Sequence, residues 1–195
     1  GEMRGRRHAH IADMAEIFSI YLSFLKSEGI EELIYKAVPH IYHKAPSEED
    51  LYSLFINGFT LLKREPSTSL NMLESMKGKK MNGFRRAEKD GMTLSETTDS
   101  TRIIEVYDAN INEKYDARAV HTPAEMNLLH SRFPKNIKMF ECFMNGGFCG
   151  GVILYIAGGV VHAQYIATTA EGKRSRALDF LIVSVFEIFR SKHST

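Results

Sequence analysis

Three short apolar stretches joined by glycine-containing links constrain the fold of this chain more than any other feature. The stretches Ile137–Met144, Phe148–Ala157 and Val160–Thr168 have the length and composition of strands. Asn145-Gly146-Gly147 separates the first two, and Gly158-Gly159, a two-residue hairpin signal, separates the last two. Because links this short join antiparallel neighbours, the sequence predicts a three-stranded meander.

Helical patterns precede and follow this meander. Apolar residues recur at helical spacing over Asp99–Tyr115, and Thr122 begins a second helix that ends before Pro134. The start of that second helix is a strong signal, since Pro123 suits the first turn and Glu125 completes a capping box with Thr122. A long amphipathic helix is predicted over 173–190, and its buried face is formed by Ala177, Leu178, Leu181, Ile182, Val185, Phe186, Ile188 and Phe189.

The first part of the chain has a less regular pattern. Helical spacing of apolar residues predicts a helix over Ile11–Leu25. Short strands are predicted at Leu33–Val38 and Thr60–Arg64, on either side of a helix with Ser47 as its N-cap and a stop near Gly58. This part therefore predicts helix, strand, helix and strand.

A basic segment over residues 77–91 separates the two parts. It holds six Lys and Arg residues against Glu88 and Asp90 only. We expect a short helix over Asn82–Asp90, followed by a strand over Met92–Thr97. The predicted organisation is residues 1–76, a basic connecting segment 77–91, and residues 92–195. The basic residues are interpreted either as a polyanion contact or as a solvated helix face, and the three that would make the contact are Arg85, Arg86 and Lys89.

Charge and cysteine content exclude several classes of protein. The chain has 25 Lys and Arg against 24 Asp and Glu, so any anion site must be a local patch rather than a global field. Cys142 and Cys149 are the only cysteines, and we expect two reduced thiols, with a cross-strand disulfide as the alternative. No CxxC pair or zinc-type spacing occurs, so no metal is expected.

No apolar run approaches the ~20 residues that cross a bilayer. An N-terminal signal peptide is not favoured, although Arg4, Arg6 and Arg7 precede an apolar stretch, because Asp13 and Glu16 interrupt that stretch. We therefore expect no membrane span and a cytoplasmic location.

The order of two helices, an antiparallel meander and a further helix is the layout of the GNAT acyltransferase fold. The segment Asn82–Gly91 resembles the Arg/Lys-rich segment of Fem-type peptidyltransferases. The stretch Val160–Thr169, with Glu171-Gly172 and Ala177-Leu178 after it, resembles the strand-to-helix region of GNAT-like proteins of that superfamily, and Leu128–Pro134 is similar to the same proteins.

This resemblance covers about residues 11–190 and implies an α+β (mixed α/β) fold. Its sheet would be antiparallel-rich and flanked by helices, with remnants of two tandem GNAT-like halves, a partial one over 1–76 and a second over 92–195. Fem-type proteins are longer than this chain, which lacks the opening strands of the first half and stops before the closing strands of the second. We therefore expect a partial or shortened member.

The resemblance also implies where an acyl donor would bind. Backbone amides at a helix start attract phosphates, and the donor's diphosphate is expected at Gly172, Lys173, Arg174, Ser175 and Arg176. A solvated basic helix cap is the alternative interpretation of the same residues. The acyl carbonyl would meet the backbone at the C-terminal end of the central strand, at Ile166 and Ala167, and an ordinary buried strand is the alternative interpretation.

Deprotonation of the acceptor amine requires a base. The candidates are Glu141, Tyr165 and His162, and a structural role in the sheet is the alternative, since a lone histidine on a strand is more often structural than a base. Strand alternation puts His162 and Gln164 on one face and Tyr165 on the other.

The leading hypothesis is a GNAT-like N-acyltransferase that moves an acyl group from acetyl-CoA or another acyl-CoA to a primary amine. The acceptor would be a small molecule or a peptide. An alternative is Fem-type aminoacyl transfer from aminoacyl-tRNA to a cell-wall precursor, with residues 77–91 as the tRNA contact. A third hypothesis is a non-catalytic GNAT-like binding module, for which self-association as a homo-oligomer would be the sign.

Overall fold

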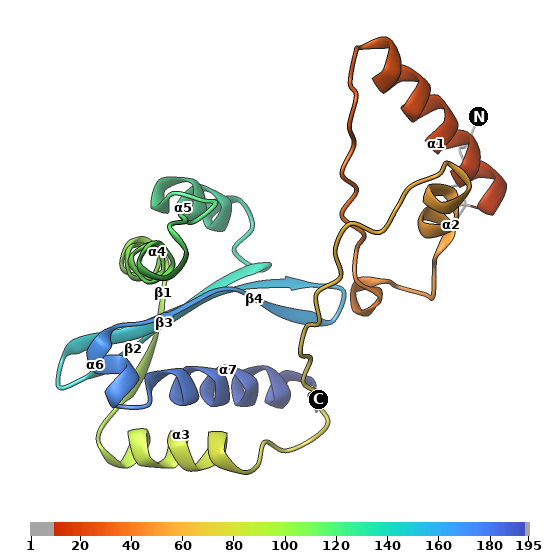
Figure 1. The fold of residues 1–195 in the computed structure, drawn as a ribbon. Helices are drawn as coiled ribbons and strands as arrows, with labels where there is room; N and C mark the ends of the chain where they lie inside the picture. Colours follow the sequence, from red (N-terminus) through yellow and green to blue (C-terminus); the bar gives the residue numbers. More distant parts are fainter. Residues whose placement is uncertain (1–9, 194–195) are drawn as a thin grey trace. The chain divides into compact units, whose positions relative to one another are not determined.

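The computed structural model describes residues 10–193 and divides the chain into two compact units, Gly1–Thr68 and Ser69–Thr195 (Figure 1). The basic segment 77–91 falls inside the second unit, whereas the sequence analysis treats it as a connection. The physical reason is packing, since the helix in that segment lies against the last helix of the chain. Residues Arg4, Arg6 and Arg7 lie outside the described residues.

The second unit is built on a four-stranded antiparallel sheet with the strand order β1-β2-β3-β4. The strands are β1 (Thr93–Thr97), β2 (Ile137–Met144), β3 (Gly147–Ala157) and β4 (Val160–Thr168). The predicted meander is confirmed as β2, β3 and β4, and β1 pairs with the outer side of β2. Both β1 and β4 are therefore edge strands of this sheet.

Helices cover both faces of the sheet (Figure 1). One face carries α4 (Thr101–Tyr115) and α5 (Pro123–Arg132), and the other carries α3 (Lys79–Lys89) and α7 (Ala177–His193). The predicted capping box of α5 is present, with Thr122 and Glu125 bonded to each other. The expected α+β fold, with an antiparallel sheet flanked by helices, is confirmed.

Each face of the sheet has its own apolar core. The core under α4 and α5 contains Ile103, Ile104, Met126, Ile137, Met139, Ile153 and Tyr165. The core under α3 and α7 is larger and contains Ala87, Met92, Phe140, Cys142, Cys149, Val152, Leu154, Ala177, Phe180, Leu181, Val185 and Phe189. Both thiols are buried and free in this core, and burial, with a smaller contribution from Cys149, raises the pKa of Cys142 to about 12.

A bulge in the β3–β4 ladder changes which side chains of β4 share a face of the sheet. Ile153 pairs with Tyr165 and Leu154 pairs with Ala163, so Gln164 is an extra residue without a partner on β3. The prediction that His162 and Tyr165 point to opposite faces is therefore wrong. A bulge shifts the alternation by one residue, and His162 lies on the α4 side, opposite Tyr155, as Tyr165 does.

The helix predicted over 173–190 is in fact two helices. A short helix α6 (Ala170–Arg174) follows β4 directly, and Arg176 then takes a left-handed backbone conformation before α7. Gly172 packs so tightly on the start of β3 that an added Cβ would come within 1.9 Å of the Cys149 carbonyl oxygen. This close approach holds α6 against the sheet.

The first unit contains α1 (Ile11–Ser27), a 3-10 turn η1 (His40–Tyr42) and α2 (Glu49–Ile56). The strands predicted at Leu33–Val38 and Thr60–Arg64 are wrong, since neither segment forms regular secondary structure or belongs to a sheet. A strand needs a partner edge for its backbone groups, and the described part of this unit offers none. The first GNAT-like half thus stays a prediction without a sheet to support it.

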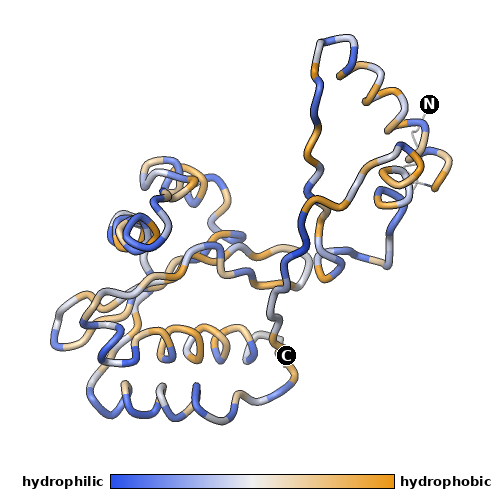
Figure 2. Tube along the Cα trace, in the orientation of Figure 1, coloured by the Kyte–Doolittle hydropathy of each residue, from blue (hydrophilic) through white to orange (hydrophobic). Residues whose placement is uncertain are grey.

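The start of α2 also differs from the expectation. Its N-cap is Glu48 rather than Ser47, whose hydroxyl instead donates to the Glu49 carboxylate at 2.5 Å. Phe18 and Ser53 are the only buried residues among the described residues of the first unit. Both helices contain many apolar residues (Figure 2), and several of the large ones are exposed. This unit therefore has almost no core of its own.

Candidate functional site

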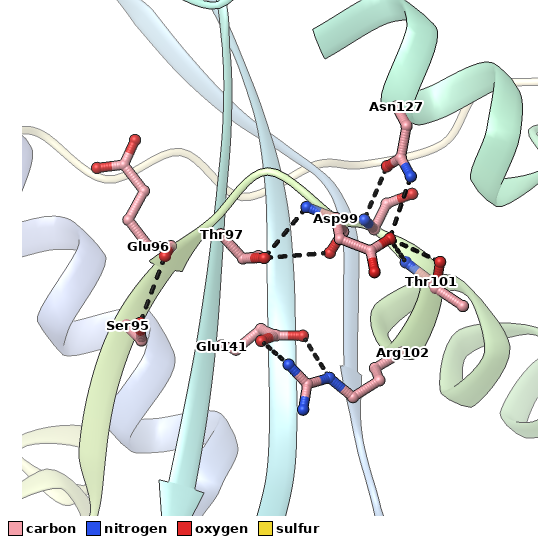
Figure 3. A network of polar contacts seen from close by, with 9 residues as sticks. Ser95, Glu96, Thr97, Asp99, Thr101, Arg102, Asn127 and Glu141 are labelled. Carbon is pink, nitrogen blue, oxygen red and sulfur yellow. Dashed lines mark hydrogen bonds and ion pairs between the residues drawn. The ribbon is translucent and has the colours of Figure 1, made fainter. Parts of the chain in front are cut away.

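Polar side chains gather on the α4 side of the sheet, and the first group is an ion pair. Glu141 on β2 is 2% exposed and accepts hydrogen bonds from Arg102 Nε at 3.1 Å and Nη2 at 2.7 Å (Figure 3). The Arg102 guanidinium also lies 5.3 Å from the Phe143 ring centre and 5.5 Å from that of Phe148. Both carboxylate oxygens are occupied, so in this arrangement Glu141 anchors Arg102 and is not a free base.

The position of Arg102 depends on how α4 begins. Asp99 Oδ1 accepts from the Thr101 amide at 3.0 Å, the Thr101 hydroxyl at 2.6 Å and Asn127 Nδ2 at 3.1 Å (Figure 3). The Ser100 amide donates to Asn127 Oδ1 at 2.8 Å, which joins the start of α4 to α5. The hydrogen bonds that the Asp99 carboxylate accepts lower its pKa, and the bond from the Thr101 hydroxyl is the largest cause.

A second polar pair links β4 to the loop between α4 and α5. The Tyr165 hydroxyl lies 2.6 Å from His121 Nδ1. Tyr165 is 2% exposed and packs edge-on against Tyr107, with ring centres 4.9 Å apart, whereas His121 is only half-buried. His121 is therefore the more accessible member of this pair.

The sequence analysis missed both His121 and Arg102. His121 directly precedes the N-cap Thr122, so its place at the end of a loop was readable, but its contact with Tyr165, 44 residues along the chain, was not. His162 is exposed on the same face of β4 as Tyr165, opposite Tyr155.

The acyl carbonyl was expected beside Ile166 and Ala167 on a central strand, whereas these residues lie on β4, which is an edge strand of the sheet. Asn110 Nδ2 on α4 donates to the Thr168 carbonyl at 3.1 Å, so the backbone groups of Thr168 face outward. In a strand, residues two apart direct their backbone groups to the same side. The amide of Ile166 therefore also faces the open edge, and that of Ala167 faces β3, its partner being Gly151.

The turn from β4 into α6 and α7 was expected to hold phosphates on its amides. The Gly172 amide donates to Thr169 Oγ1 at 3.0 Å, and the Lys173 amide donates to the Thr169 carbonyl at 2.9 Å. The Ser175 amide is bonded within the same turn. These internal hydrogen bonds weigh against residues 172–175 as an amide cradle for a diphosphate.

The cationic side chains of this turn also have partners. Lys173 Nζ donates to Asn110 Oδ1 at 3.2 Å, and Arg174 is paired with Glu171. Arg176 Nη1 lies 3.9 Å from Asp179 Oδ2. An anion at this turn would therefore have to compete with these contacts.

The predicted polyanion residues do lie together on the solvent side of α3. Arg85, Arg86 and Lys89 are all exposed, while Gly83 and Ala87 form the buried side. Arg86 has a long ion pair of 3.9 Å with Asp90. Within the described residues, Arg85 and Lys89 have no ion-pair partner.

This chain has a weak structural similarity to a solved protein domain but no match by sequence. No protein-family model and no curated protein matches its sequence. Among solved structures, it is similar to the crystal structure of the C-terminal domain (DUF2156) of a putative lysylphosphatidylglycerol synthetase from Agrobacterium fabrum. The identity is 14% and the TM-score 0.44, over 58% of this chain and 37% of that chain. A likeness of this strength carries no argument about function.

No helix within residues 10–193 is long and apolar enough to cross a membrane. In the same residues, no three His, Cys, Asp or Glu side chains gather in a way that could hold a metal ion.

Proposed function

We propose that the second unit transfers an acyl group from an activated donor to a primary amine at the outer edge of β4. The observation that carries this proposal is the bulge at Gln164, beside the Tyr165–His121 pair, on an edge strand with no further strand beyond it in the described part of the chain. Bulges of edge strands often redirect a side chain beside an active site. The GNAT-like order of elements supports the same reaction class.

His121 is the proposed base and Tyr165 its positioning residue. In the tautomer that this role requires, His121 Nδ1–H donates to the Tyr165 oxygen, and the Nε2 lone pair is free. The buried Tyr165, packed against Tyr107, then holds the imidazole in one orientation. The half-buried His121 can meet a substrate, whereas Tyr165 cannot.

The proposed reaction is a direct transfer. The amine nitrogen attacks the donor's carbonyl carbon, and the outward amide of Ile166 donates a hydrogen bond to the carbonyl oxygen as negative charge develops there. A nitrogen–carbon bond forms, and the bond from that carbon to the donor's sulfur or oxygen breaks. The amine proton passes to His121 Nε2, and the leaving group takes the electron pair of the broken bond.

The acyl-CoA donor remains the first candidate. Its phosphates would contact the side chains of Lys173, Arg174 and Arg176, which are close to the end of β4, rather than the occupied amides of the turn. The exposed cations Arg85 and Lys89 on α3 favour a second candidate, an aminoacyl-tRNA donor, since a polyanion is attracted to such unpaired charge.

The test is a transfer assay on the full chain with panels of acyl-CoA donors and primary amines. The release of the coenzyme A thiol measures the rate. A His121→Asn variant should lose about 100-fold or more in rate, while the exposed His40→Asn in the first unit should keep wild-type activity. Transfer that survives in His121→Asn would remove histidine from the mechanism. No turnover of any donor would favour the binding module.

The two donors separate by tRNA binding. A salt-sensitive tRNA complex that weakens in Arg85→Ala and Arg86→Ala, but not in the first-unit control Lys63→Ala, would favour the aminoacyl donor. Saturable stabilisation by coenzyme A, lost in Arg176→Ala, would favour the acyl-CoA donor.

A further inference from the structure

The guanidinium of Arg102 keeps one of its two hydrogen-bonding edges open. A guanidinium has N–H donors arranged so that each of two edges can hold a pair of acceptor oxygens. Glu141 fills the first edge, since it accepts from Nε at 3.1 Å and from Nη2 at 2.7 Å. The second edge, formed by Nη1 and the other N–H of Nη2, has no hydrogen-bond partner within residues 10–193.

This open edge is accessible from solvent. The Arg102 side chain is 56% exposed, whereas that of Glu141 is 3% exposed. Figure 3 shows the third nitrogen of the guanidinium directed away from Glu141. The strand beside Glu141 is β1, which is an edge strand, so no further strand of the described sheet covers this side. A small ligand can therefore reach the open edge directly.

Glu141 and two aromatic rings hold the guanidinium in one orientation. A contact through two hydrogen bonds restrains both the position and the plane of an arginine head group. The ring centres of Phe143 and Phe148 lie 5.3 and 5.5 Å from Arg102 Cζ, and the rings form an apolar wall beside it. Burying a carboxylate in an ion pair is a poor way to gain stability. It is, however, an effective way to preorganise a binding group.

The charges around the open edge favour a carboxylate over a phosphate. Arg102 and Glu141 together carry no net charge, and the exposed Asp99, which interacts electrostatically with Arg102, adds a negative charge. A phosphate dianion would therefore meet like charge without a surplus cation to balance it. A carboxylate has a single charge, and its two coplanar oxygens match the open edge. The apolar wall further favours an acid with an apolar body.

We propose that Arg102, positioned by Glu141, binds the carboxylate of a small organic acid whose apolar body contacts Phe143 and Phe148. This site is separate from the outer edge of β4. Glu141 on β2 pairs with Gly151 on β3, and β4 lies beyond β3. Two strand spacings, about 10 Å, therefore separate Glu141 from β4. The inference does not depend on the proposed reaction.

Binding of phenylacetate to the full chain tests the proposal, and phenylacetamide is the neutral control of similar shape. In an NMR titration of the wild type, phenylacetate should saturably shift the backbone amide signals of Arg102, Phe143 and Phe148. Phenylacetamide and inorganic phosphate should each bind about 10-fold more weakly or less. Equal binding of the acid and the amide, tighter binding of phosphate, or shifts confined to other parts of the chain would overturn the proposal.

Two substitutions distinguish an oriented edge from simple attraction of charge. Arg102→Lys keeps the positive charge but loses the planar pair of donors, so it should weaken phenylacetate binding by about 10-fold or more. Glu141→Gln removes a negative charge from the site, yet it should also weaken binding, because an amide can accept from only one of the two donors and the guanidinium loses its anchor.

The matched control is Arg132→Lys, at an exposed position in the last turn of α5, and it should bind phenylacetate like the wild type. Unchanged binding in Arg102→Lys, or tighter binding in Glu141→Gln, would reject the oriented site. Circular dichroism checks that each variant is folded. Because the wild-type titration uses no substitution, it tests the proposal even if a variant does not fold.

Discussion

The two units use similar apolar helices with very different results. In the second unit, α4 and α7 each lie on one face of a shared sheet, and that sheet gives each of them a continuous apolar surface. In the first unit, α1 packs on the short helix α2, and its side chains Ile17, Ile20 and Phe24 are more than half exposed. The difference teaches that an amphipathic pattern makes a helix, but a core requires a second apolar layer.

The largest expected effect comes from truncating the same residue type in each unit. Ile153→Ala, at a fully buried position of β3, should destabilise the second unit by about 2–5 kcal/mol because it leaves a cavity. Ile34→Ala, at a position that is 67% exposed in the first unit, should change stability by less than about 0.5 kcal/mol. Urea unfolding followed by circular dichroism measures both, and equal effects would erase the contrast between the units.

The close contact of α6 with the sheet gives the next effect. Gly172→Ala would place a methyl group against the Cys149 carbonyl. Because the backbone must shift, we expect the free energy of unfolding to fall by about 1–3 kcal/mol. Gly147→Ala is the matched control, since its Cβ would meet only the Met144 carbonyl oxygen at an ordinary 3.4 Å. Thermal unfolding of the two variants makes the comparison, and similar midpoints would show that α6 is loosely held.

The ion pair beneath α4 should respond unequally to loss of its two members. Arg102→Met leaves the buried Glu141 carboxylate without its partner and should lower the free energy of unfolding by about 2 kcal/mol. Glu141→Gln should cost less, because the Arg102 side chain is 56% exposed and can turn to water. A double-mutant cycle by urea unfolding measures the coupling between them. Equal losses from both single variants would contradict this asymmetry.

The smallest effect is a pH dependence that separates the units. Burial raises the pKa of Cys142 to about 12, above its value of about 9 in an unfolded chain. The folded state therefore holds this proton more tightly, and the stability that it provides is complete below pH 9 and falls as pH rises towards 12. At pH 10 the loss should be about 1 kcal/mol.

The first unit should respond only at higher pH. Burial, followed by the hydrogen bond with Asp50, raises the pKa of Tyr35 from 10.0 to about 12, so its contribution falls only above pH 10. Unfolding of Cys142→Ala between pH 8 and 10 should show a flatter decline than the wild type. If stability declines as steeply in this variant as in the wild type, other titratable groups cause the decline.

Much of the second unit was readable from local pattern. The bounds of β2 and β4 match the prediction, and the capping box at Thr122 marks the start of α5. These features depend on residues close together in sequence, such as a glycine turn or a hydroxyl three residues from a carboxylate. The candidate site was less readable. Tyr165 and Glu141 were identified, but their partners His121 and Arg102 contact them across 44 and 39 residues of chain, respectively.

The sequence by itself determined where most helices form, although not the break between α6 and α7, where the meander turns, and that the net charge leaves room only for local charged patches. Tertiary structure decided the facing of His162, because the extra residue Gln164 depends on how β4 aligns with β3. It also decided that the strand-like segments of the first unit stay unpaired, since a strand forms only where a partner edge is present. Short-range hydrogen bonding and periodicity are local properties of a chain, whereas register and pairing depend on its neighbours in space.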